Sequence, residues 1–186
     1  MTGLASDLVP ELVLAARGLR AHARAGCVLS GRRSAYIEWD DPQFRDAVSL
    51  GYRKIELVPD LLAVRDDNVK MALFDFESSE RVIEPAFARF RDRLQVVVTG
   101  PHWLDIMPPG VNKAVGLCAV QQALGIPPER TMVIGDYLND LEMMDAAHWS
   151  FAMANAHPAL KARARFSAPS NDEGGAMQAI RALLRL

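Results

Sequence analysis

The 186-residue sequence has few of the features that mark secreted, membrane-spanning or nucleic-acid-binding proteins. It holds only two cysteines, Cys27 and Cys118, whose separation fits no metal or redox motif, so we expect two buried thiols in a reducing cytoplasm. No apolar run approaches the length that spans a bilayer, and residues 1–11 lack the basic and apolar pattern of a signal peptide. The formal net charge of −2 gives no electrostatic argument for a nucleic-acid partner.

Other common site signatures are missing too. The four histidines form no metal-ligand spacing, and no Gly-x-Gly-x-x-Gly follows a predicted strand, which argues against a dinucleotide-binding module. The chain has no internal repeat, low-complexity tract or long linker. Because 50% of its residues are hydrophobic, it has enough apolar side chains for one large domain or two small ones.

Residues 1–108 contain strands that follow one another closely. Apolar residues recur at helical spacing from Leu12 to Ala23, and we expect Gly26 to end that helix. Further helices are predicted after Asp41 and after Ser78. The candidate strands cover residues 27–30, 34–38, 54–58, 69–74, 94–99 and 102–107. This order predicts an α/β unit in which several strand pairs are antiparallel hairpins.

Residues 109–186 have a different pattern, in which strands alternate with helices. Asn112 is predicted to cap a helix that Gly125 ends. The later strands are expected near residues 131–135, 149–153 and 165–168, with helices at 140–146, 158–164 and 175–186. Such alternation is typical of parallel βαβ units, so the fold class is α/β.

The stretch from Thr131 to Asp140 is the strongest candidate site. Its apolar run ends at Gly135 and is followed by Asp136, which an α/β sheet would place at the carboxyl end of a strand, where such folds bind ligands. Asn139 or Asp140 can cap the helix that follows. A carboxylate pair beside helix amides can hold a hard cation and a phosphate together.

Gly135-Asp136-x-x-Asn139-Asp140 resembles the fourth motif of the haloacid dehalogenase (HAD) superfamily, and more narrowly that of the Cof-type phosphatases, which carry an α/β cap. Lys113 lies upstream as the third-motif lysine of that family does. Downstream, the segments 152–156 and 170–175 follow the order and approximate spacing of the family. The match therefore consists of four linked motifs and not of one hexapeptide.

The resemblance implies a HAD-like fold in which residues 1–108 form a cap-like α/β domain and residues 109–186 form the C-terminal half of a Rossmann-like parallel-sheet core. It also implies a Mg²⁺-dependent phosphomonoester hydrolase that works through an aspartyl-phosphate. The cap would select the substrate, a sugar phosphate or similar small metabolite.

By the same resemblance, Asp136 is a catalytic residue and a direct Mg²⁺ ligand, and Asp140 orients the metal site or holds a metal-bound water. Lys113 is a catalytic, phosphate-binding residue, and Asn139 contacts the substrate phosphate. Simpler interpretations exist: Asp136 could be a turn residue and Lys113 a solvated residue. A cation in a first helical turn is slightly unfavourable, however, which favours phosphate binding at Lys113. Asn155 lies in the segment 152–156 that matches the family, but it could equally be a turn residue with no other role.

The Asp-x-Asp-Gly-Thr nucleophile motif of the family has no match in this sequence, and its second-motif Ser or Thr is not evident. Asp75-Phe76-Glu77 ends an apolar strand but lacks the second aspartate and the Gly-Thr. We therefore expect this chain alone to be incomplete or inactive. The strand before Asp136 would then have an unpaired edge, through which a second copy or a completing chain could pair. The alternative hypothesis is a non-catalytic remnant that acts as a phosphate-binding or assembly module.

Overall fold

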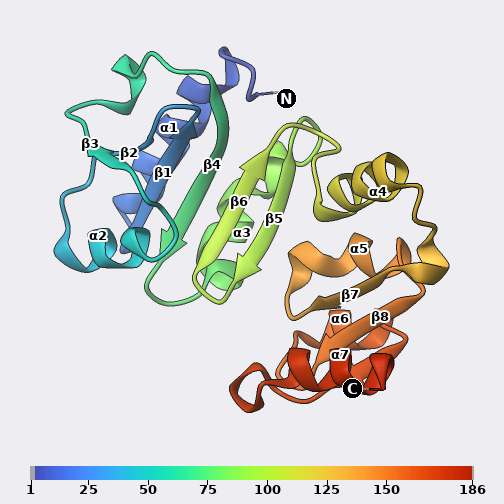
Figure 1. The fold of residues 1–186 in the computed structure, drawn as a ribbon. Helices are drawn as coiled ribbons and strands as arrows, with labels where there is room; N and C mark the ends of the chain where they lie inside the picture. Colours follow the sequence, from blue (N-terminus) through green and yellow to red (C-terminus); the bar gives the residue numbers. More distant parts are fainter. Residues whose placement is uncertain (1–2, 186) are drawn as a thin grey trace. The chain divides into compact units, whose positions relative to one another are not determined.

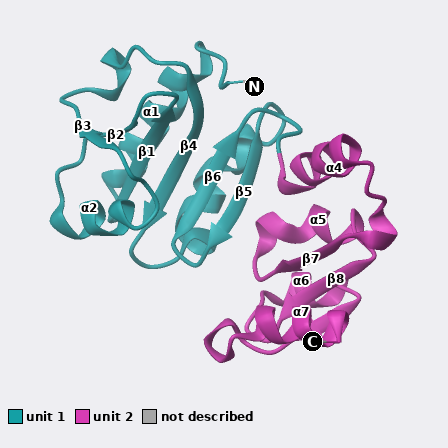
Figure 2. Cartoon of the chain, in the orientation of Figure 1, with its two compact units in different colours: residues 1–111 teal, residues 112–186 magenta. Residues whose placement is uncertain are grey.

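The computed structural model describes residues 3–185, which divide into two compact units: unit 1 ends at residue 111 and unit 2 begins at residue 112 (Figure 2). Each unit has its own β-sheet, with six strands in unit 1 and three in unit 2 among the described residues. In residues 3–185, no helix is long and apolar enough to cross a membrane.

Unit 1 is built on a mixed sheet with the strand order β3-β2-β1-β4-β6-β5 (Figure 1). Its strands are β1 (Ala25–Gly31), β2 (Ala35–Ile37), β3 (Ile55–Leu57), β4 (Asn68–Asp75), β5 (Gln95–Gly100) and β6 (Trp103–Met107). β2 and β3 are parallel, and the other neighbouring pairs are antiparallel. The two hairpins expected from the sequence, β1–β2 and β5–β6, are confirmed.

The helices of unit 1 begin where the sequence predicts, but one ends earlier. They are α1 (Leu8–Arg20), α2 (Pro42–Ser49) and α3 (Glu84–Phe87), with a π-helical turn at Ser79–Ile83 and 3₁₀ turns at Leu61–Ala63 and Ala88–Phe90. Asp41 caps α2, because its Oδ1 accepts the N–H of Phe44 at 3.0 Å. The expectation that Gly26 ends α1 is wrong: Gly26 lies in β1, where it pairs with Phe74 of β4.

One face of this sheet carries the buried aliphatic residues of β4 and β6. Met71 and Leu73 of β4 lie on it beside Ile106 and Leu104 of β6, and all four are buried. Helices α1 and α3 contact the strands on this side (Figure 1). The burial of these aliphatic side chains forms the main core of the unit.

The opposite face is covered over only part of its width. Ala72 and Phe74 of β4 pack there against Val28 of β1 and against Phe44 and Val48 of α2. On β6, the residues that alternate with the buried ones are only half-buried. Helix α2 therefore leaves the β6 side of this face open.

An ion-pair network joins α1 to the loops beyond β2 and β3. The guanidinium of Arg17 donates to Glu38 at 2.8 and 2.5 Å and to Oδ1 of Asp60 at 2.5 Å. Glu38 also accepts the N–H of Leu61 at 3.1 Å, and only 7% of its side chain is exposed. The hydrogen bond from Arg17 lowers the pKa of Glu38 below its usual value, although burial opposes this shift.

Unit 2 has a parallel sheet with the strand order β7-β8-β9. The strands are β7 (Met132–Gly135), β8 (Trp149–Met153) and β9 (Phe166–Ala168). The helices are α4 (Lys113–Leu124), α5 (Leu141–Asp145), α6 (Pro158–Arg163) and α7 (Gly175–Leu184), with 3₁₀ turns at Pro128–Arg130, Leu138–Asp140 and Asn171–Glu173. The predicted alternation of strands and helices is confirmed.

Helix α4 begins and ends where the sequence predicts, but its side chains are more exposed than expected. Oδ1 of Asn112 accepts the N–H of Val115 at 3.0 Å, and Gly125 ends the helix with a φ of +63°. No residue of α4 is buried. Cys118 lies on this helix and is exposed, whereas Cys27 is buried in β1, so the expectation of two buried thiols is wrong for Cys118.

We predict that Arg17→Met lowers the free energy of unfolding at pH 7 by about 2 to 3 kcal/mol, because it leaves the Glu38 carboxylate buried without its main partner. Since the folded-state pKa of Glu38 is depressed, this stabilisation exists above the unfolded pKa and is lost as the pH falls through the folded pKa. The difference between the variant and the parent should therefore shrink in acid, as measured by urea unfolding at several pH values.

The matched control is Arg93→Met. Arg93 pairs with Glu11 at 3.0 Å, but both side chains are more than 40% exposed. This variant should lose much less stability than Arg17→Met, because exposed ion pairs contribute little. Equal losses in the two variants would contradict a specific role for the Arg17–Glu38 pair.

Candidate functional site

The predicted site residues of unit 2 lie near the carboxyl end of β7. The strand ends at Gly135, and Asp136 follows it with an exposed side chain. Asn139 is half-buried in the 3₁₀ turn Leu138–Asp140 that leads into α5. Lys113 is the first residue of α4.

The structure brings Lys113 and Asp140 into direct contact. Nζ of Lys113 forms an ion pair with Oδ1 of Asp140. The Asp140 side chain is only 4% exposed, whereas that of Lys113 is 50% exposed. The buried carboxylate is therefore neutralised by a lysine that also reaches solvent.

The second oxygen of Asp140 is bonded to the backbone of the turn. Its Oδ2 accepts the N–H of Asp136 at 3.1 Å and lies 3.5 Å from the N–H of Tyr137. Asp140 therefore holds the backbone from which the Asp136 side chain projects. Asp140 holds the N-cap position of α5, one of the two positions expected from the sequence, but its side chain makes no cap bond to α5 and bonds instead to the backbone of Tyr137, the cap residue of the preceding 3₁₀ turn.

The glycine of the motif is required by this arrangement. A Cβ atom at Gly135 would lie 2.7 Å from Cβ of Asp140 and 2.8 Å from its Oδ2. Real side chains do not approach so closely, so Asp140 can fold back over the strand end only when residue 135 is glycine. This contact explains physically why glycine and aspartate occur at this spacing.

The loops after β8 and β9 are tied to each other by an asparagine. Oδ1 of Asn155 accepts Oγ–H of Ser170 and the N–H of Asn171, each at 3.2 Å. Gly175 is needed beside this link, since an added Cβ would lie 2.0 Å from the carbonyl oxygen of Pro169. Asn155 thus has the role of a turn residue that joins two loops.

Sequence reasoning missed the part played by His157. Its N–H donates to the carbonyl oxygen of Asp136 at 2.8 Å, and its Nδ1 accepts the N–H of Ala159 at 3.2 Å. His157 therefore caps α6 and holds the backbone of Asp136 at the same time. The available signal was Pro158, because proline favours the first helical position and so marks the preceding residue as a cap.

Asp75, the other carboxylate at a strand end, has a structural environment. Its side chain is buried and Oδ1 accepts the N–H groups of Glu77 and Ser78 at 2.7 and 2.9 Å. These bonds close the turn after β4. Asp75 belongs to unit 1, whereas Asp136 belongs to unit 2.

The residues around Asp136 fit part of a magnesium shell. Mg²⁺ prefers hard oxygen ligands and takes one or two protein carboxylates with several waters. Asp136 offers one exposed carboxylate, while both oxygens of Asp140 already have partners. Within residues 3–185, no group of three or more His, Cys, Asp or Glu side chains could hold a metal ion. The described side chains can therefore supply one direct Mg²⁺ ligand, Asp136, and a positively charged side chain nearby, Lys113.

Comparisons with known proteins identify the family of this chain. A family model described as haloacid dehalogenase-like hydrolase matches residues 17–180. The chain is 32% identical over 165 residues to the 5-amino-6-(5-phospho-D-ribitylamino)uracil phosphatase YbjI of Escherichia coli (strain K12), a match that covers 85% of this chain and 59% of the relative. The chain thus spans less than two thirds of the length of that relative.

Two solved structures have the same fold. The crystal structure of SMU.1108c from Streptococcus mutans UA159 aligns with a TM-score of 0.88 at 26% identity, covering 100% of this chain and 70% of that chain. The HAD subclass IIB sugar phosphatase BT4131 aligns with a TM-score of 0.83 at 19% identity, and the alignment covers 100% of this chain and 69% of BT4131.

The α/β fold is that of the HAD-like hydrolases, as the resemblance in the sequence predicts. The chain belongs to the haloacid dehalogenase-like hydrolase family.

We predict that Gly135→Ala lowers the free energy of unfolding by about 1 to 3 kcal/mol, because its Cβ would displace the Asp140 carboxylate. The control is Gly116→Ala in α4, where an added Cβ meets nothing within 4 Å. That change should instead raise stability by about 0.5 to 1 kcal/mol, since alanine favours a helix over glycine. Urea unfolding of both variants gives the signs, and a Gly135→Ala protein as stable as the parent would contradict the proposed contact.

Proposed function

We propose that this chain supplies the cap-like domain, residues 1–108, and the metal- and phosphate-binding half of the core, residues 109–186, of a Mg²⁺-dependent phosphomonoester hydrolase. The observation that carries the proposal is the turn after β7. There the exposed Asp136 projects from a backbone held by a buried carboxylate, Asp140, which in turn is paired with Lys113.

Each residue has a distinct role in this proposal. Asp136 is a direct Mg²⁺ ligand, and Asp140 orients it through the turn. Lys113 balances the charge of Asp140 and, being half-exposed, can also bind a phosphate oxygen. Asn139 contacts the phosphate from the same turn. When bound, Mg²⁺ would stabilise negative charge on the phosphoryl oxygens.

The nucleophilic carboxylate must come from outside the described cluster. In the described sheet, β7 pairs on one side only, with β8. Unpaired strand edges are templates for another strand. We propose that a completing segment, from another chain or from a longer form of this protein, pairs there, and that these 186 residues alone do not turn over substrate.

A small phosphorylated metabolite is the proposed substrate. The E. coli relative is a phosphatase for a phosphoribityl-substituted uracil, and BT4131 is a sugar phosphatase, so both substrates join phosphate to a polyol or sugar. We place the protein in the cytoplasm, because both of its cysteines are unpaired.

The second candidate function is a non-catalytic phosphate-binding or assembly module. It is favoured by the exposed apolar side chains of α4, Val115, Val120 and Leu124, which lie in the same unit as the unpaired edge of β7. Exposed apolar surface of this kind marks interaction sites. A second copy of the chain would be the partner, and a chain that stays monomeric in sedimentation at high concentration would contradict this function.

The enzyme proposal is tested with p-nitrophenyl phosphate. The 186-residue chain should show no Mg²⁺-dependent turnover. A fusion that adds the part of YbjI with no counterpart in this chain should turn over the substrate only with Mg²⁺. In that fusion, Asp136→Asn should lower turnover by about 100-fold or more, as expected for loss of a charge that stabilises the transition state.

The matched control is Asp92→Asn, an exposed aspartate of unit 1, which should leave turnover unchanged. Mg²⁺-dependent turnover by the 186-residue chain would show that it is complete. A fully active Asp136→Asn fusion would refute the metal-binding role of Asp136.

A further inference from the structure

Unit 1 has a cavity of about 790 Å³ on the open part of its sheet. Strands β4 and β6 form its floor, and the chain that follows α2, including Leu50 and Tyr52, forms a wall. Its size lies in the usual range for sites that bind small molecules. All of its lining residues belong to unit 1.

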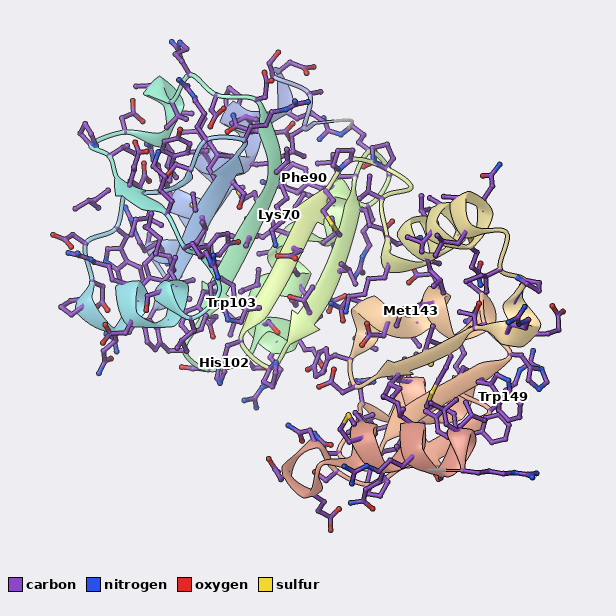
Figure 3. All side chains as sticks on the ribbon, in the orientation of Figure 1. Lys70, Phe90, His102, Trp103, Met143 and Trp149 are labelled. Atoms are coloured by element: carbon purple, nitrogen blue, oxygen red, sulfur yellow. The ribbon has the colours of Figure 1, made fainter. Side chains whose placement is uncertain are left out.

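The floor of the cavity is aromatic. Trp103 of β6 and Phe74 of β4 are cross-strand partners, with ring centroids 4.8 Å apart. His102 lies next to them, 5.8 Å from the Phe74 ring, and Figure 3 shows His102 and Trp103 together at the turn end of β6. The Phe74 and Trp103 rings are tilted by 58° and Phe74 is buried, so Trp103 is the ring against which a ligand ring can stack.

One ion pair provides the polar part of the floor. Nζ of Lys70 lies 2.9 Å from Oδ2 of Asp105, which is on β6. The side chains are 31% and 16% exposed, and Nζ lies 5.8 Å from the centroid of the Tyr52 ring. Figure 3 shows Lys70 at the boundary between β4 and β6. Burial disfavours the charge of Lys70, but the charges and hydrogen bonds of Asp105 and Tyr52 together outweigh burial and raise the pKa of Lys70.

The chemistry of this pair favours an uncharged ligand. Lys70 can donate hydrogen bonds and Asp105 can accept them, so together they present a donor beside an acceptor. Their charges cancel, and the remaining lining residues include no Arg or second Lys. A free anion such as phosphate would therefore find no net positive charge in this cavity. An uncharged ring whose edge carries a carbonyl beside an N–H matches the pair, because the carbonyl can accept from Lys70 and the N–H can donate to Asp105.

We propose that this cavity binds a flat, uncharged heterocycle, which stacks on Trp103 and hydrogen-bonds through an adjacent carbonyl and N–H to Lys70 and Asp105. Trp103, Lys70 and Asp105 are then specificity-determining residues. That the ring belongs to the phosphorylated substrate rests on the proposed hydrolase function, whereas its binding to unit 1 does not.

The test uses calorimetric titration of the full chain, without Mg²⁺ and without any phosphate ester, so a failure of the hydrolase proposal does not affect it. The probe is lumazine, a flat two-ring heterocycle with adjacent carbonyl and N–H groups. Ribitol serves as a polyol without a ring, and inorganic phosphate as an anion. Lumazine should bind, while ribitol and phosphate should neither bind nor displace it.

Variants assign the binding to the cavity. Trp103→Leu and Lys70→Met should each weaken lumazine binding about tenfold or more, which corresponds to about 1.4 kcal/mol. Trp103→Phe should retain most of the affinity because it keeps an aromatic surface. Lys54→Met, at an exposed lysine of the same unit, is the matched control and should change nothing. Circular dichroism checks that each variant is folded.

Two results would overturn the proposal. One is lumazine affinity that is unchanged in both Trp103→Leu and Lys70→Met while these proteins remain folded. The other is ribitol binding that competes with lumazine, which would assign the cavity to a polyol.

Discussion

The site depends above all on one buried carboxylate. Asp140 accepts a hydrogen bond from the N–H of Asp136 with one oxygen and pairs with Lys113 through the other. A buried charge is costly unless it is paired and hydrogen-bonded, and Asp140 meets both conditions. Its close approach requires glycine at position 135, while His157 holds the carbonyl oxygen of Asp136 from the loop after β8. The exposed side chain of Asp136 is thereby presented from a backbone fixed on both sides.

The two units divide the chemical tasks in our account. Unit 2 offers a carboxylate and a lysine, which suit a divalent cation and a phosphate. Unit 1 offers an aromatic floor with one neutralised ion pair, which suits an uncharged ring. The difference follows from how each sheet is covered. In unit 1, α2 leaves the β6 side of one face open, whereas in unit 2 the polar groups gather where the parallel strand β7 ends.

Local sequence patterns were enough to predict most of the helices and strands. Alternation, helix caps such as Asn112 and the left-handed Gly125 depend on neighbouring residues, so they could be predicted, as could the HAD-like family. Features set by distant residues could not. Gly26 belongs to a strand because of its pairing with β4, Cys118 is exposed because α4 buries none of its residues, and the pair Lys70–Asp105 forms only when β4 meets β6. The sequence suggested Asp140 as a helix cap or metal residue, and only the structure showed that both of its oxygens are engaged.

The most direct test of the central claim is a two-dimensional amide NMR titration of the chain with Mg²⁺ and then with inorganic phosphate. NMR suits this test because a partial metal shell should bind weakly. Our account predicts Mg²⁺-dependent shifts concentrated at residues 135–140, followed on phosphate addition by shifts that include the start of α4 at Lys113. Shifts that are absent, or that cluster away from these residues, would contradict the account. The same would hold if Asp136→Asn left the titration unchanged.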